Sequence, residues 1–212
     1  MSRPPASSTV SSSPVSSVAA RLADSGDRFN KCLARLLEHE GGFNDIAADR
    51  GGATNFGISL RFLRAEAAIN PRVRALFPAG PIDVEDIRKL AHAQAAQIYL
   101  WCFWLPMHCD ALPAPVDGAV FDQAVNAGPR AAARLLQQAI NCALPVGRPK
   151  LLEDGQIGTR TLAAARIPAP SLIRDWMRQL AADRYKQIVR LNPSQRTFLR
   201  GWLARAAALG DV

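Results

Sequence analysis

Residues 28–42 read RFNKCLARLLEHEGG, and this stretch indicates how the chain starts to fold. Its apolar residues return every three or four positions, as they do along one face of an amphipathic helix. The glycines at positions 41 and 42 end the pattern, because glycine is a poor helix former. The stretch therefore predicts a helix from about residue 28 to about residue 40, with a buried face made of Phe29, Cys32, Leu33, Leu36 and Leu37.

Glu40 continues this apolar stripe at the carboxyl end of the predicted helix. A carboxyl group turned toward a core loses hydration, which raises its pKa and lets it keep a proton closer to neutral pH. The negative end of the helix dipole acts in the same direction. A general acid needs such a proton, so Glu40 is a candidate for that role. The alternative is an exposed, frayed helix end.

The patterns that follow predict a mainly α fold with a small β-hairpin near residues 45–58, where Gly, Asp, Asn and Thr are concentrated. Ser59 can cap the next helix, and Asp83 can cap a helix that continues to Ile98. The aromatic run 99–104 is a second strand candidate. Further helices are expected at 116–128, from Pro129 to about 144, within 154–165, at about 170–191 and around 198–203.

Composition divides the chain into three segments. Residues 1–27 are a Ser- and Pro-rich stretch with too little apolar surface to offset the entropy of ordering, which predicts a flexible tail. Residues 28–115 are expected to form one domain. Residues 116–212 are expected to form a second, helical half that packs on the first.

The charge balance favours a polyanionic partner. The chain has 26 Lys and Arg against 18 Asp and Glu, a net charge of +8. No apolar run of about 18 residues is present, so no membrane span is expected, and the first residues lack the apolar segment of a secretory signal. The basic residues are interpreted as dispersed and no nucleic-acid-binding motif accompanies them, so no nucleic-acid partner is expected.

No metal or other cofactor is predicted. The cysteines form no CxxC pair and are expected to behave as small buried hydrophobic residues: Cys32, Cys102, Cys109 and Cys142. His39 and Glu40 begin an HExxH frame, but Phe43 stands where the second histidine is needed, which rejects a zinc protease.

Three ordered blocks resemble one enzyme family over about residues 29–190. They are EGGF (40–43) with DRGGATNFGI (49–58), then VFDQAVNAG (120–128), then DGQIGTRTL (154–162). The chain resembles glycoside hydrolase family 108, the phage and bacterial lysozymes or N-acetylmuramidases, including their predicted peptidoglycan-binding carboxyl-terminal half. The resemblance implies a lysozyme-like helical fold that cleaves the bond between N-acetylmuramic acid and N-acetylglucosamine in peptidoglycan.

This resemblance implies catalytic roles for Glu40, Asp49 and Thr54. In glycoside hydrolysis one group protonates the leaving oxygen, while a second group positions water or stabilises the developing positive charge. Glu40 takes the first role and Asp49 the second, with Thr54 orienting the water. Four residues separate Asp49 from Thr54, whereas the wider phage-type lysozymes have five. Asp45 is a competing second carboxylate, whose alternative role is an Asx turn.

Four further residues are candidates for substrate binding: Asp122, Asn126, Tyr99 and Trp104. Asp122 and Asn126 lie one helical turn apart, where they could line a sugar cleft or bond to neighbouring backbone. Tyr99 and Trp104 could stack on sugar rings, and the alternative is that the aromatic residues pack in the core.

The leading functional hypothesis is a muramidase that acts as a bacteriolytic phage endolysin on bacterial peptidoglycan. It would be a monomer made in the cytoplasm without a signal peptide, reaching the periplasmic or extracellular wall after export or holin-mediated release. The alternatives are a secreted antibacterial muramidase effector and a non-catalytic wall-binding module. The presence of both Glu40 and Asp49 argues against the last.

Overall fold

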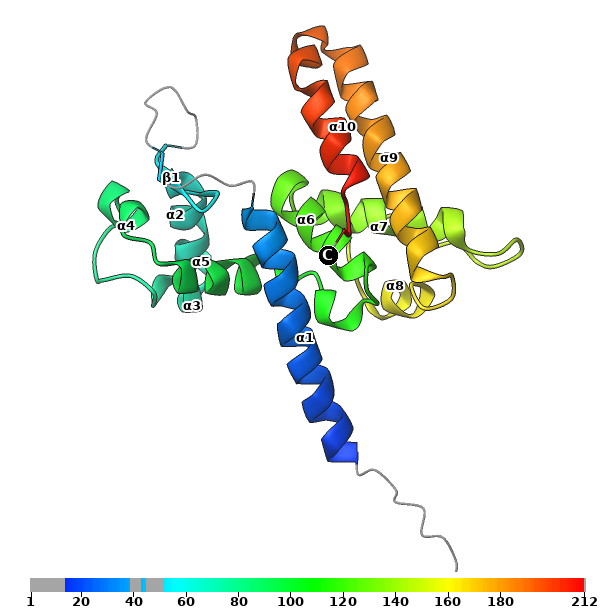
Figure 1. Ribbon diagram of the computed structural model, residues 1–212, viewed down its shortest axis with the longest axis horizontal. Coiled ribbons are helices and arrows are strands. Elements are labelled where there is room, and N and C mark those ends of the chain that lie inside the picture. Colours follow the sequence, from blue (N-terminus) through cyan, green and yellow to red (C-terminus); the bar gives the residue numbers. More distant parts are fainter. Residues whose placement is uncertain (1–13, 39–42, 45–51, 212) are drawn as a thin grey trace, which may run out of the picture.

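The computed structural model describes residues 14–38, 43–44 and 52–211, and within them the chain is mainly helical with one small antiparallel sheet (Figure 1). This confirms the predicted fold class. The elements are α1 (Pro14–Leu37), β1 (Thr54–Asn55), β2 (Ile58–Ser59), α2 (Leu60–Ile69), α3 (Pro71–Arg74), α4 (Val84–Arg88), α5 (His92–Tyr99), the π-helical turn η1 (Leu100–Trp104), the 3₁₀ turn η2 (Cys109–Ala111), α6 (Val116–Ala127), α7 (Pro129–Ala143), α8 (Thr159–Ala164), α9 (Pro170–Leu191), the 3₁₀ helix η3 (Pro193–Phe198) and α10 (Leu199–Ala207).

Helix α1 starts earlier and ends earlier than the pattern predicts. It begins at Pro14, a residue suited to the first helical turn, and runs through the Ala-rich segment 18–23. The predicted tail 1–27 is therefore helical from Pro14 onward, while residues 1–13 lie outside the described residues. The helix ends at Leu37, and its predicted apolar face is buried, with Leu37 itself half-buried.

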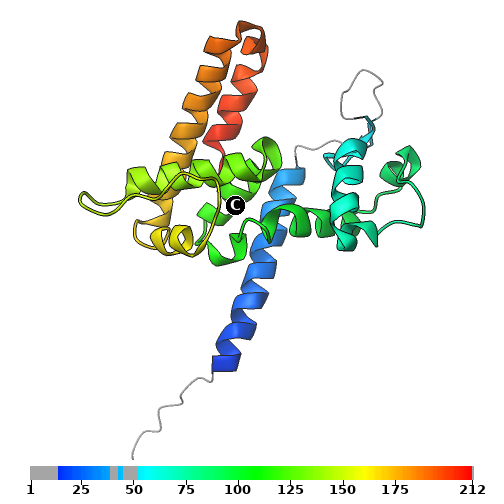
Figure 2. The ribbon, with the colours of Figure 1, turned by 180° about the vertical axis from the view of Figure 1, so that it is seen from behind.

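Helix α1 crosses between two groups of elements, as both views show (Figures 1 and 2). The hairpin and α2–α5 lie on one side, and α6–α10 lie on the other. Helix α5 continues directly into η1, which carries the chain from the first group toward the second. The strand candidate at 99–104 is wrong, because this run is helical and packs its aromatic rings into the core.

Two predicted helix caps are confirmed. The Ser59 hydroxyl accepts a hydrogen bond from the backbone N–H of Phe62 at 3.1 Å, and Asp83 accepts from the first turn of α4. The single helix predicted after Asp83 is two helices, however. Helix α4 ends at Arg88, and α5 starts afresh where Gln94 Oε1 accepts from the N–H of Ala91 at 2.9 Å.

An aromatic cluster and an ion pair attach α1 to its neighbours. The Phe29 ring meets Trp104 and Phe121 edge-on, with centroid separations of 5.5 and 5.9 Å. Beside it, the Arg28 guanidinium donates to both carboxylate oxygens of Asp117 on α6, at 3.0 and 2.8 Å. These contacts fix α1 against α6 and η1 together.

Helices α6 and α7 form the base of the second group, and α9 packs on both. The apolar face predicted for α7 is buried, and α9 spans the predicted 170–191. Helices α9 and α10 pair as an arm that extends away from the rest of the molecule (Figures 1 and 2). Among the described residues, no helix combines the length and apolar character needed to cross a membrane.

Candidate active site

The hairpin that carries Thr54 is built on a tight two-residue turn. Strands β1 and β2 pair antiparallel with Thr54 opposite Ser59, and the turn residues Phe56 and Gly57 both have positive φ, at 50° and 72°. A positive φ is strained for Phe56, and the surrounding side chains stabilise it. The Tyr99 hydroxyl donates to the Phe56 carbonyl oxygen at 2.8 Å, and the Phe56 ring lies edge-on to His92.

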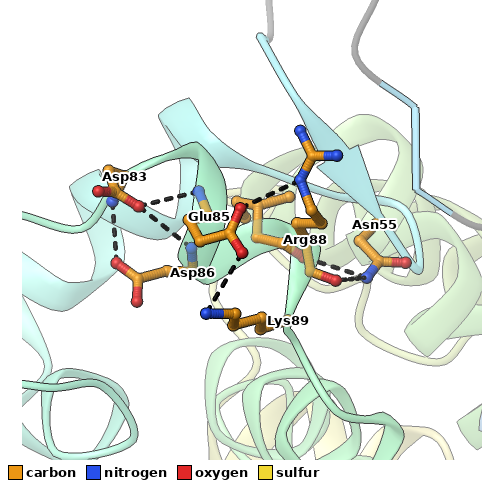
Figure 3. Close-up of polar contacts among 7 residues, drawn as sticks. Asn55, Asp83, Glu85, Asp86, Arg88 and Lys89 are labelled. Atoms are coloured by element: carbon orange, nitrogen blue, oxygen red, sulfur yellow. Dashed lines mark hydrogen bonds and ion pairs between the residues drawn. The ribbon is translucent and has the colours of Figure 1, made fainter.

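Asn55 fastens the same hairpin to α4 (Figure 3). Its side chain is 6% exposed, and its amide donates to the carbonyl oxygen of Ile87 at 3.0 Å and, at a longer 3.5 Å, to that of Arg88. Helix α4 is fixed in turn by a capping box, in which Asp83 and Asp86 each accept from the other's backbone N–H. The hairpin therefore sits on a short, well-capped helix.

Arg88 holds the segment that enters the hairpin. Its guanidinium carbon lies 4.4 Å from the centroid of the Phe43 ring, a cation–π contact, and its Nε lies 3.2 Å from the Glu85 carboxylate (Figure 3). Phe43 belongs to the EGGF block that begins with Glu40. Helix α4 thus positions the chain on both sides of the segment that contains Asp45 and Asp49.

Thr54 is half-buried beside Asn44. The backbones of these two residues exchange two hydrogen bonds of 2.8 Å, and the Thr54 hydroxyl donates a long one, 3.5 Å, to the Asn44 carbonyl oxygen. This pairing closes the ends of the segment that contains Asp45 and Asp49. Glu40, Asp45 and Asp49 themselves lie outside the described residues, so their roles stay predictions.

The structure places Asp122 and Asn126 in a polar network on α6. The Asn126 amide donates to the carbonyl and carboxylate oxygens of Asp122 at 2.8 and 2.9 Å, and Arg205 of α10 donates to the same carboxylate at 3.2 Å. These contacts correspond to the backbone-bonding alternative. Asp122 also lines a small cavity together with Arg35 and Leu36, so it lies near the carboxyl end of α1.

Tyr99 and Trp104 lie in the core and present no surface on which a sugar could stack. Each is 1% exposed, and the Trp104 ring packs edge-on against Phe29 and Phe121. The substrate-binding role expected for this pair is therefore corrected to a structural one. Large aromatic rings bury more apolar area than other side chains, which favours the core position.

The DGQIG block is fixed to α7 by Gln137, which is 1% exposed. Its Nε2 donates to the Asp154 carboxylate at 2.7 Å and to the Gln156 carbonyl at 2.9 Å, and its Oε1 accepts from the Gly155 N–H at 2.9 Å. The hydrogen bond from Gln137 is the main cause that lowers the pKa of Asp154. Gly155 has a φ of +78°, and a Cβ at this position would lie 2.7 Å from Arg130 Cγ.

Within the described part of the chain, no group of three His, Cys, Asp or Glu side chains could hold a metal ion. The four cysteines are free thiols. Cys32 and Cys109 are buried as expected, whereas Cys102 is half-buried and Cys142 is exposed.

Comparison with known proteins agrees with this architecture. The family model described as "Glycosyl hydrolase 108" matches residues 33–128, from the buried face of α1 through the hairpin to the end of α6. This part of the chain belongs to the glycosyl hydrolase 108 family. A second model, described as "Predicted Peptidoglycan domain", matches residues 131–207. The resemblance inferred from the three sequence blocks is confirmed.

A solved structure of SagA from Brucella abortus is similar to this glycosyl hydrolase over most of its length. The two share 29% sequence identity with a TM-score of 0.68, and the alignment covers 88% of this chain and 93% of SagA. The comparison with curated proteins found no match. The predicted division into domains near residue 115 stays a prediction.

Sequence reasoning missed three residues that position the blocks of this glycosyl hydrolase: Asn55, Arg88 and Gln137. Asn55 stands in a Gly-rich turn, where an asparagine usually serves the turn itself. Arg88 reads as one more charge on a solvated helix face. Gln137 offered the only usable signal, since it is a polar residue next to Leu136 on the apolar face of α7.

Proposed function

We propose that this glycosyl hydrolase is a muramidase that cleaves the bond between N-acetylmuramic acid and N-acetylglucosamine in bacterial peptidoglycan. The family match over residues 33–128, followed by a peptidoglycan domain over 131–207, carries the proposal. The described geometry supports it, because α4 holds the chain on both sides of the segment that contains Asp49. No metal or cofactor is required for this chemistry.

In the proposed reaction Glu40 donates its proton to the glycosidic oxygen as the bond from that oxygen to the muramic acid C1 breaks. Asp49 stays ionised and either stabilises the developing positive charge or positions the attacking water. Thr54 orients that water through its hydroxyl, which is held by only one long hydrogen bond within the described residues. Water adds its oxygen to C1, and the proton that it loses restores the acid–base pair.

The acid is tested by Glu40→Gln, with Glu38→Gln as the matched control. Loss of the proton donor should reduce turnover on purified cell walls by about a hundred- to ten-thousand-fold, while the fold survives. Glu38 is exposed and paired with Arg35, so its variant should keep wild-type turnover. A folded Glu40→Gln protein that clears walls at the wild-type rate would reject this mechanism.

The second carboxylate is tested by comparing Asp49→Asn with Asp45→Asn. The first should lose most turnover and keep wall binding, whereas the second should have a mild effect, because Asp45 is assigned to a turn. If the two variants exchanged these behaviours, Asp45 would be the catalytic carboxylate.

The bond that is cut can be identified by mass spectrometry of the released muropeptides. Reducing muramic acid ends would support a muramidase. Anhydro ends would indicate a lytic transglycosylase, and cut peptides an amidase or peptidase. A protein that binds the wall but releases no muropeptide would instead support a non-catalytic wall-binding module.

The biological role proposed for this activity is host lysis by a phage endolysin acting on the wall from outside the cytoplasm. The resemblance to phage lysozymes supports it. Expression in a bacterial cytoplasm with a pore-forming holin should cause lysis, whereas expression without the holin should not. Killing only of neighbouring cells, through a secretion machine, would favour the antibacterial effector.

A further inference from the structure

Basic charge is concentrated near the carboxyl end of the chain. Residues 184–205 contain six Lys and Arg and no Asp or Glu, compared with a net charge of +8 for all 212 residues. The interpretation of the basic residues as dispersed is therefore wrong for this segment. These residues lie on α9, η3 and α10, and α9 and α10 pack against each other.

This segment runs along α9, through the tip of the arm at η3, and back along α10 toward α6 (Figures 1 and 2). Two of its cations have carboxylate partners: Lys186 pairs with Asp183, and Arg205 with Asp122. The other four are exposed and make no ion pair within residues 14–38, 43–44 and 52–211: Arg184, Arg190, Arg196 and Arg200.

The same tip exposes large apolar side chains. Leu191 is 76% exposed and Phe198 is 53% exposed. Below them an aromatic stack stiffens the tip, with Trp202 lying 5.8 Å from the Phe198 ring and 5.4 Å from the Tyr185 ring between centroids. A projecting surface that combines apolar side chains with guanidinium groups is typical of proteins that bind at a bilayer interface.

We propose that the tip of the α9–α10 arm docks on the anionic phospholipid surface of a membrane. Arg190, Arg196 and Arg200 would pair with lipid phosphates, and Leu191 and Phe198 would enter the boundary between headgroups and acyl chains. A lipid surface accounts for both features. Nucleic acid or a hydrated wall polymer would use the charge but would leave the two apolar side chains in water. Docking there would hold the hydrolase beside the wall that it cuts.

The test is co-sedimentation of the full chain with vesicles made of equal parts of phosphatidylethanolamine and phosphatidylglycerol. The chain should bind them, release with rising salt, and fail to bind vesicles of phosphatidylcholine alone. The variant Arg190→Gln/Arg196→Gln/Arg200→Gln should bind on the order of 100-fold more weakly, since each basic residue near the surface contributes roughly a five-fold factor. Leu191→Ser/Phe198→Ser should also weaken binding.

The matched control is Arg72→Gln/Arg148→Gln/Arg160→Gln, which removes the same charge from exposed positions elsewhere. It should retain most of the binding. Unchanged thermal unfolding of the tip variants will show that they are folded. Absence of vesicle binding by the wild type, or equal loss in the control, would overturn the proposal. A tip-dependent affinity for lipid-free sacculi or a DNA duplex, without affinity for the vesicles, would overturn it in favour of that polymer. None of these results depends on turnover.

Discussion

Three buried polar side chains connect elements that are far apart in the sequence. Asn55 bonds the hairpin to α4, Asp117 binds Arg28 of α1, and Gln137 holds the DGQIG block. A buried polar group that loses its partner costs about 1–3 kcal/mol. Each of these side chains therefore favours one arrangement of its two elements over the alternatives.

Asn55→Ala should reduce both stability and turnover. The variant loses the bond to the Ile87 carbonyl, at a cost of about 1–3 kcal/mol, and releases the strand that carries Thr54. Small displacements of catalytic groups lower the catalytic rate strongly, so kcat on cell walls should fall roughly ten-fold or more. Asn141→Ala is the control. It loses the bonds between α7 and Leu151 far from the hairpin, and should destabilise without changing kcat. Equal kcat in both variants would show that Asn55 does not position the site.

The cysteines should differ sharply in reactivity. Burial raises the pKa of the Cys32 and Cys102 thiols to about 12, and burial raises that of Cys109 well above its ordinary value. The thiolate is the reactive form, and it increases only as pH approaches these values. At pH 8, iodoacetamide should modify exposed Cys142 first and reach Cys32 and Cys109 only after unfolding. Mass spectrometry of the labelled peptides measures the order. Rapid labelling of Cys32 in the folded protein would contradict the packing of α1.

At the scale of elements, the turn in the DGQIG block depends on a glycine. Gly155→Ala should destabilise the protein because its φ of +78° is strained for alanine and the new Cβ would lie 2.7 Å from Arg130 Cγ. Gly147→Ala is the matched control, with a φ of +86°, and beyond its two chain neighbours no heavy atom of the described residues lies within 4 Å of the new Cβ. The control should lower the free energy of unfolding by roughly 1–2 kcal/mol, and Gly155→Ala should lower it by more. Urea unfolding gives both values. Equal losses would mean that Arg130 moves aside freely.

At the scale of the whole molecule, α1 holds the two groups of elements together. Asp117→Ala removes a 4%-exposed carboxylate that accepts from the Arg28 guanidinium and from the Gly118 N–H, which should cost about 3 kcal/mol. For a chain of this size that lowers the melting temperature by roughly 6–12 °C in calorimetry. Asp175→Ala breaks an exposed pair with Arg174 and should cost less than about 1 kcal/mol. A loss at Asp117 no larger than that at Asp175 would show that the link between α1 and α6 is weak.

The sequence by itself determined the helical character, several helix bounds and caps, and the family. Local sequence encodes these features because each acts over one or two helical turns. Apolar spacing predicts α7 and α9, and the side chains of Ser59 and Asp83 cap their helices. The blocks that carry Glu40, Asp49 and Thr54 were enough to indicate glycoside chemistry, although only Thr54 lies among the described residues.

Only the tertiary structure decided which side chains share an environment. Arg28 and Asp117 are 89 residues apart, and the Tyr99 hydroxyl meets Phe56 across 43 residues, so no local period reports either contact. The same limit explains Tyr99 and Trp104, whose spacing fits a sugar-binding surface as well as a core. Tertiary packing decides between the two, because Phe29 of α1 packs on Trp104 and Phe121 of α6 packs on Tyr99. It also explains the basic tip. The end of α9 and the start of α10 meet at one tip only because those helices pair, since helix packing and not sequence distance sets which segments are neighbours.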